Sequence, residues 1–180
     1  ARSVAEIGVM NLEVFRAESR MDPSNWGAAR MLIEGRHQFD LIDPQTDLSG
    51  YRVVILPDAV PVEGDLAQKL NAFVAAGGAL ICSGVSGFAK GGRVSEIDNY
   101  PVESEGQRPF APEFLRPSAA LHPDDDTDFV VYERGQTLMP VAGSEVLARI
   151  VEPYFQRDCA RFCPHTHTPP KAGAAGGAAV

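Results

Sequence analysis

The run Arg52-Val53-Val54-Ile55-Leu56 constrains the fold of this chain more than any other segment. Its continuous apolar and largely β-branched character suits a strand that is covered on both faces, and such strands are typical of parallel sheets. Pro57 follows directly and ends the strand, because proline cannot donate a hydrogen bond to a neighbouring strand. The sequence therefore predicts a buried strand of a parallel sheet at residues 52–56.

Segments on either side of this strand predict an alternation of strands and helices. The other expected strands of this part are residues 5–10, 38–42 and 79–82. A first helix is expected between Ser24, its N-cap, and Gly35, and a second at residues 63–76. This order is typical of an α/β, flavodoxin-like, doubly wound and mostly parallel sheet, with a crevice at the carboxyl ends of its strands. The residues expected on the rim of that crevice are Asn11, Asp58 and Ser83.

The pattern changes after Gly92, where proline and charged residues become frequent. We expect four segments: core α/β layers at 1–92, a Pro-rich excursion at 93–128, later strands and a histidine loop of the same domain at 129–170, and a low-complexity tail at 171–180. A doubly wound domain needs one more strand and helix than these segments provide. The domain is therefore expected to be truncated at its C-terminus.

Composition excludes several classes of partner. The net charge is -8 and the basic residues are scattered, which argues against a nucleic-acid partner. No apolar run approaches the roughly 20 residues of a membrane helix, so no membrane contact is expected. Three cysteines are too few for a disulfide framework and fit a reducing, cytoplasmic compartment. No glycine-rich loop has nucleotide-binding spacing, and we expect neither a cofactor nor a metal.

Cys82 is the candidate nucleophile, because it ends a predicted buried strand and is followed closely by Gly84. Such a nucleophile needs a base within hydrogen-bond reach and usually has a small residue two positions earlier. Leu80 occupies that earlier position, and no base is identifiable. The favoured interpretation is a core strand that ends in a glycine turn.

A second candidate is the histidine loop near the end of the chain. Its possible zinc ligands are Cys159, Cys163, His165 and His167, but their spacing matches no standard zinc site. Contact of His165 and His167 with a ligand or an interface, together with Tyr154, is favoured over metal binding. A plain surface loop remains the alternative. Acidic residues are plentiful, yet none forms a recognisable pair of glycosidase carboxylates.

Several segments together resemble the β-galactosidase trimerisation domain of large multidomain glycoside hydrolases. The segments are residues 5–9, the turn at 20–25, Tyr51-Arg52-Val53-Val54-Ile55-Leu56-Pro57-Asp58, residues 70–80 and Val151-Glu152-Pro153-Tyr154-Phe155. The most specific part covers about residues 5–90. The last segment, with the following His-Thr-His-Thr-Pro-Pro, is similar to the family 42-related, α-fucosidase-like subgroup.

The resemblance implies a fold similar to class I glutamine amidotransferases, without their activity. Leu80 departs from the Gly-x-Cys-x-Gly pattern of those enzymes, and no His-x-Glu follows. The implied role is a non-catalytic accessory and oligomerisation domain that packs on its own catalytic (β/α)8 barrel and on other subunits. Two alternatives stay open: an amidotransferase-like hydrolase that uses Cys82, and a carbohydrate-binding module that uses the loop of His165 and His167.

Overall fold

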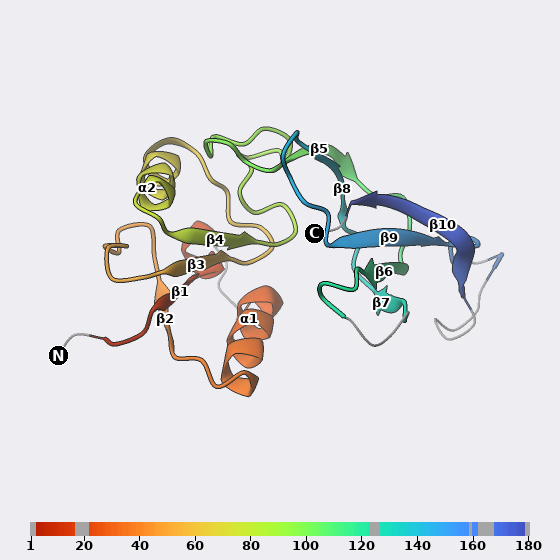
Figure 1. The fold of residues 1–180 in the computed structure, drawn as a ribbon, viewed down its shortest axis with the longest axis horizontal. Coiled ribbons are helices and arrows are strands. Elements are labelled where there is room, and N and C mark those ends of the chain that lie inside the picture. Colours follow the sequence, from red (N-terminus) through yellow and green to blue (C-terminus); the bar gives the residue numbers. More distant parts are fainter. Residues whose placement is uncertain (1–2, 17–21, 123–126, 159, 162–167, 179–180) are drawn as a thin grey trace. The chain divides into compact units, whose positions relative to one another are not determined.

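The chain folds into two compact units, which are Ala1–Tyr100 and Pro101–Val180 (Figure 1). The structure is a computed structural model. It describes residues 3–16, 22–122, 127–158, 160–161 and 168–178.

The first unit contains a parallel sheet with the strand order β2-β1-β3-β4. Its strands are β1 (Ile7–Met10), β2 (Phe39–Ile42), β3 (Val53–Leu56) and β4 (Ala79–Cys82). Its helices are the short 3-10 helix η1 (Leu12–Phe15), α1 (Pro23–Glu34) and α2 (Gly64–Ala75). Each strand and α-helix expected before residue 83 is present within two residues of its predicted bounds, because each has a strong local apolar pattern.

The core of this unit lies on the face of the sheet that α2 covers. Leu66, Leu70 and Phe73 of α2 are buried there. They pack in one cluster with Val54 and Leu56 of β3, both fully buried. The helices α1 and α2 lie on opposite sides of the sheet (Figure 1).

The second unit is an antiparallel sheet with the order β5-β8-β10-β9-β6-β7. Its strands are β5 (Val102–Gln107), β6 (Glu113–Pro117), β7 (Phe129–Val131), β8 (Gln136–Pro140), β9 (Ala148–Pro153) and β10 (Pro170–Ala178). Inside this unit Arg108 and Glu113 form a buried ion pair, with 2.6 Å between Nε and Oε2.

The prediction of a flavodoxin-like, doubly wound fold of the class I glutamine amidotransferase type is wrong. The two α-helices found among the described residues both precede β4, and every described strand after it belongs to the antiparallel sheet. Antiparallel neighbours can be joined by short turns and need no crossover helix. The frequent prolines after residue 100 also disfavour helices, because proline removes a helical hydrogen bond. Within the described ranges, no helix is both long and apolar enough to cross a bilayer.

The packing of α2 is open to a direct test. Leu70 is fully buried, so we expect Leu70→Ala to lower the free energy of unfolding by about 2–5 kcal/mol. Met31→Ala on α1, where the side chain is 74% exposed, serves as the control and should change it by less than about 0.5 kcal/mol. Urea unfolding followed by circular dichroism measures both. Equal costs for the two variants would contradict the assignment of the core to the α2 face.

Candidate functional site at the carboxyl edge of the parallel sheet

Two of the predicted rim residues, Asp58 after β3 and Ser83 after β4, are in direct contact. Ser83 Oγ donates a hydrogen bond to Asp58 Oδ1 at 2.7 Å and accepts one from the Asp58 backbone N–H at 2.9 Å. The backbone N–H of Val85 donates to the Asp58 carbonyl oxygen at 2.6 Å. Asp58 has a positive φ of 33°, and a Cβ on Gly84 would lie 2.5 Å from its carbonyl oxygen. The two loops therefore fit together only with glycine at position 84.

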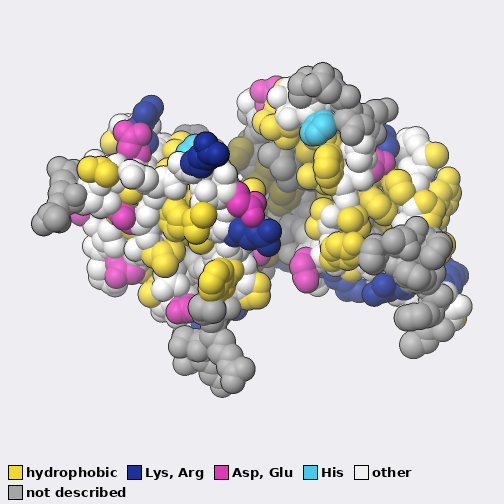
Figure 2. All heavy atoms as spheres, turned by 90° about the horizontal axis from the view of Figure 1, so that it is seen from below, with side chains coloured by type: hydrophobic (Ala, Val, Ile, Leu, Met, Phe, Trp, Pro, Cys, Tyr) yellow, Lys and Arg dark blue, Asp and Glu magenta, His cyan; other side chains and the backbone are white. Residues whose placement is uncertain are grey.

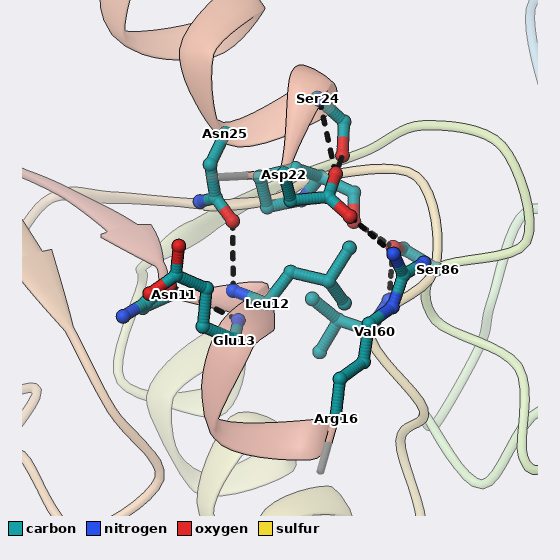
Figure 3. Close-up of polar contacts among 10 residues, drawn as sticks. Asn11, Leu12, Glu13, Arg16, Asp22, Ser24, Asn25, Val60 and Ser86 are labelled. Atoms are coloured by element: carbon teal, nitrogen blue, oxygen red, sulfur yellow. Dashed lines mark hydrogen bonds and ion pairs between the residues drawn. The ribbon is translucent and has the colours of Figure 1, made fainter. Parts of the chain in front are cut away.

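Ser86 ties the same two loops together from inside. Its side chain is buried and donates to the Pro57 carbonyl oxygen at 2.9 Å. It also accepts a hydrogen bond from the backbone N–H of Val60 at 2.9 Å (Figure 3). These polar groups bond to one another and to the adjoining backbone, so they hold the loops of this part of the edge in place.

The third rim residue, Asn11, is at the start of η1. Asn11 Oδ1 accepts a hydrogen bond from the backbone N–H of Glu13 at 3.1 Å and caps this short helix. Asn25 of α1 bridges the same turn (Figure 3). Its Nδ2 donates to the Met10 carbonyl oxygen at 2.9 Å, and its Oδ1 accepts from the Leu12 N–H at 2.8 Å. Asn11 thus caps η1, and this hydrogen bond involves neither Asp58 nor Ser83.

Asp22, not the predicted Ser24, is the N-cap of α1. Its carboxylate accepts hydrogen bonds from the backbone N–H and the hydroxyl of Ser24, and it forms an ion pair with Arg16 (Figure 3). Burial acts to raise the pKa of Asp22, but the Ser24 hydrogen bonds and the Arg16 charge outweigh it and hold the pKa below its usual value. The signal for this cap was Pro23 in the first helical turn, which favours a capping residue directly before it.

A cavity of about 290 Å³ opens beside these loops. Its lining includes Phe15, Arg16, Val85, Phe88 and Lys90. Both cationic side chains already have carboxylate partners, Asp22 for Arg16 and Glu63 for Lys90. Among the described residues that line it, the cavity therefore presents mainly apolar surface and no catalytic constellation.

Cys82 lies half-buried at the end of β4, against the hydrophobic core. Burial raises the pKa of its thiol, and a hydrogen bond with Tyr100 offsets this only in part. Tyr100 donates its hydroxyl hydrogen to the Ser86 carbonyl oxygen at 2.9 Å. A nucleophilic cysteine requires a lowered pKa, so this setting favours a packing role for Cys82.

The histidine loop lies largely outside the described residues. Cys159, Cys163, His165 and His167 all fall in the segments that are not described, so their predicted contacts stay predictions. Tyr154 directly follows β9 and is 57% exposed. Among the described side chains, no group of three or more His, Cys, Asp or Glu residues is arranged to hold a metal ion.

Comparison with known proteins identifies the matching family. Residues 30–103 match the family described as Beta-galactosidase trimerisation domain. This segment belongs to that family. Beta-galactosidase BgaP of Planococcus sp. (strain L4) is 33% identical over 94 residues, which make up 52% of this chain and 14% of that protein. The resemblance inferred from the sequence is therefore confirmed.

Solved structures extend the similarity over nearly the whole chain. Alpha-L-fucosidase isoenzyme 2 from Paenibacillus thiaminolyticus matches 97% of this chain with 33% identity and a TM-score of 0.85. The beta-galactosidase from Bacillus circulans sp. alkalophilus matches 87% with 22% identity and a TM-score of 0.66, which shows a shared fold. The chain spans 27% of the first structure and 26% of the second, so each is several times longer than the matched part.

The Asp22 cap predicts a stability change that depends on pH. Because the folded pKa of Asp22 is lowered, its contribution is present above the unfolded value of 3.8 and is lost as the pH falls through the folded pKa. Asp22→Ala should cost about 1 kcal/mol at pH 7. The gap between wild type and variant should shrink toward pH 2 in urea titrations. Asp65→Ala, at an exposed carboxylate in the first turn of α2, is the control, and an equal effect there would refute the special role of Asp22.

The raised pKa of Cys82 predicts slow alkylation. At pH 8 the folded protein should react with iodoacetamide at this position much more slowly than the same protein in urea, because little thiolate forms and the sulfur is partly covered. Peptide mass spectrometry separates Cys82 from Cys159 and Cys163. A rate that is equal in both states would indicate a reactive thiolate and would support the amidotransferase-like alternative.

Proposed function

We propose that this chain is a non-catalytic accessory and oligomerisation domain of a glycoside hydrolase, which packs on a catalytic barrel and on neighbouring subunits. The family of residues 30–103 supports an assembly role. The relatives are named for sugar hydrolysis and are several times longer than this chain, which supports a catalytic barrel in the remainder of such a protein. The observation that carries the proposal is an open apolar face on the parallel sheet.

The open face is the one opposite α2, and its residues form rows across the strands. In one row Leu41 of β2, Val9 of β1, Ile55 of β3 and Ile81 of β4 are successive partners. Val9 in the middle is fully buried. Leu41 and Ile81 at the two edges are 62% and 53% exposed. Strands of a parallel sheet are normally covered on both faces, so this row lacks cover at both ends.

The helix on this face adds apolar surface of its own. None of the α1 residues is buried, and the exposed fractions are 54% for Trp26, 74% for Met31 and 66% for Ile33. Figure 2 views the first unit from the side on which α1 lies, and hydrophobic side chains reach the surface there. Grouped exposed apolar side chains mark interaction surfaces, and tryptophan is enriched among the residues that contribute most to binding. Trp26 and Ile33 are seven positions apart and lie on the same side of α1. We call the side of the first unit that carries Trp26, Ile33, Leu41 and Ile81 the α1 face.

The carboxyl edge of the sheet supports the non-catalytic part of the proposal. Asp58, Ser83 and Ser86 bond to one another or to the backbone of the adjoining loops. Burial raises the pKa of the Cys82 thiol, which disfavours the thiolate. These groups serve the scaffold, and the chain contributes surface rather than chemistry.

Substitution on the α1 face tests the proposal. We expect Trp26→Asp to weaken self-association of the protein at least about tenfold, because a large apolar contact is replaced by a charge. Light scattering coupled to size-exclusion chromatography over a concentration series measures the effect. Val74→Asp, at a 38% exposed position of α2, is the matched control and should leave association unchanged. A protein that is monomeric throughout, or an equal loss in both variants, would contradict the proposed surface.

A further inference from the structure

Two cavities adjoin at the amino edge of the parallel sheet, the edge opposite to Asp58 and Ser83. Their volumes are about 520 and 530 Å³, and each is within the range of small-molecule sites, roughly 300–1,000 Å³. Glu6, Ser49 and Tyr51 line both cavities, so the two share a wall. We call the two together the Tyr51 cavity.

The two halves of the Tyr51 cavity differ in chemistry. One half is lined by apolar side chains that include Leu48 and Phe73. The other half is lined by carboxylates and hydroxyls, among them Asp40 and Asp47. Tyr51 borders both halves, and its half-buried side chain packs against the hydrophobic core. A ligand that fills the cavity therefore meets an apolar wall, an aromatic ring and a polar wall.

The polar wall is rich in hydrogen-bond acceptors. Tyr51 Oη donates to Asp40 Oδ2 at 3.0 Å, and Ser3 Oγ donates to Asp40 Oδ1 at 2.9 Å. Ser49 Oγ donates to Asp47 Oδ2 at 2.8 Å. Burial raises the pKa of Tyr51, and its hydrogen bond to Asp40 raises it further, so the phenol keeps its proton at neutral pH. Each carboxylate or hydroxyl oxygen has further lone pairs, which suit a ligand with several O–H donors.

The charges of the polar wall already have donors from the chain itself. Glu6 Oε2 lies 3.5 Å from Arg52 Nη1. Asp40 accepts the two hydroxyl hydrogen bonds described above, and Asp47 also accepts one from the backbone N–H of Ser49 at 3.0 Å. A neutral ligand with many hydroxyl groups therefore fits this wall without bringing a charge of its own.

The loop at residues 43–50, which carries much of the polar wall, is held in place from α2. Lys69 Nζ donates hydrogen bonds to the carbonyl oxygens of Pro44 and Thr46, the second at 2.9 Å. Leu48 of the same loop is only 5% exposed and belongs to the core. A wall that is already ordered lowers the entropy cost of binding a ligand.

We propose that the Tyr51 cavity binds a neutral hexose. The sugar places a C–H face of its ring against Tyr51 and the apolar half, and it donates hydroxyl hydrogens to Asp40 and Asp47. A pyranose ring matches the cavity because it has an apolar patch and several hydroxyl groups, as the two halves require. The ligand is small and Ser49 and Gly50 are exposed, so we expect a roughly millimolar Kd. This site is additional to the α1 face and does not depend on it.

An NMR titration of the full chain with methyl β-D-galactoside tests the proposal. The backbone amide signals of Gly50, Tyr51 and Gly78 should shift together and give one Kd. Tyr51→Ala should weaken binding at least about tenfold, because the ring and the hydroxyl are both removed. Tyr51→Phe keeps the ring and should weaken binding about threefold to tenfold through the lost hydroxyl. Circular dichroism establishes that each variant is folded.

Matched controls separate this site from the other surfaces. Asp40→Asn should weaken binding, whereas Asp65→Asn, at an exposed carboxylate of α2, should leave it unchanged. Tyr154→Ala removes an exposed aromatic side chain of the second unit and should also leave it unchanged. Trp26→Asp should keep sugar binding, and Tyr51→Phe should keep self-association, so the two proposals fail separately.

Three results would overturn the proposal. The first is an absence of shifts at these three amides with sugar at tens of millimolar. The second is a Kd that Tyr51→Ala leaves unchanged or that Tyr154→Ala raises as much, since either places the sugar elsewhere. The third is a larger response of the same signals to spermidine at equal concentration, which would show that the carboxylates select a cation.

Discussion

A parallel sheet requires cover on both faces, because each strand presents side chains above and below. In the first unit one face meets this requirement: α2 and the nearby loops bury Val54, Leu56 and Leu70 completely. The other face has α1, which covers β1 and leaves Leu41 and Ile81 at the two edges in contact with solvent. The two faces of the sheet therefore differ in cover, since the described residues of the first unit leave Leu41 and Ile81 exposed on the face that carries α1.

At the carboxyl edge of the sheet, the polar side chains bond mainly to the adjoining loops. Doubly wound sheets bind ligands in the crevice outside this edge. Here the loop after β3 and the loop after β4 are fastened to each other by Asp58, Ser83 and Ser86, and Asp22 and Asn25 fasten the loop after β1. These hydrogen bonds join the loops to one another at the edge where a doubly wound sheet would bind a ligand.

The sequence predicted the first unit well and the second only in part, since strands were expected near β7 and β9 but not at β5 or β10, for a physical reason. β3 and α2 have strong local periodicity, and the partners of their apolar side chains follow from that periodicity. β5 reads Val-Glu-Ser-Glu-Gly-Gln and β10 runs through a Gly/Ala-rich segment, so neither carries an apolar pattern. The same holds for the candidate site. The sequence predicted that Asp58 and Ser83 lie at the same edge of the sheet, but not their mutual hydrogen bonds, which join residues 25 positions apart. Local patterns do not encode such pairings.

The buried pair of Arg108 and Glu113 lies beside β10, a strand whose sequence carries no apolar pattern. Burying two charges costs desolvation energy, so the pair is tolerated only where its geometry and neighbours fit closely. Arg108 donates its backbone N–H to Gly135 at 2.9 Å, and a Cβ on Gly135 would lie 3.0 Å from Glu113 Oε1. Positions for a Cβ on Gly176 and Gly177 of β10 lie 3.8 and 3.6 Å from the Arg108 guanidinium. These are ordinary van der Waals distances, so the Arg108 guanidinium lies directly against β10, and the ion pair joins the start of β6 to this glycine-rich strand.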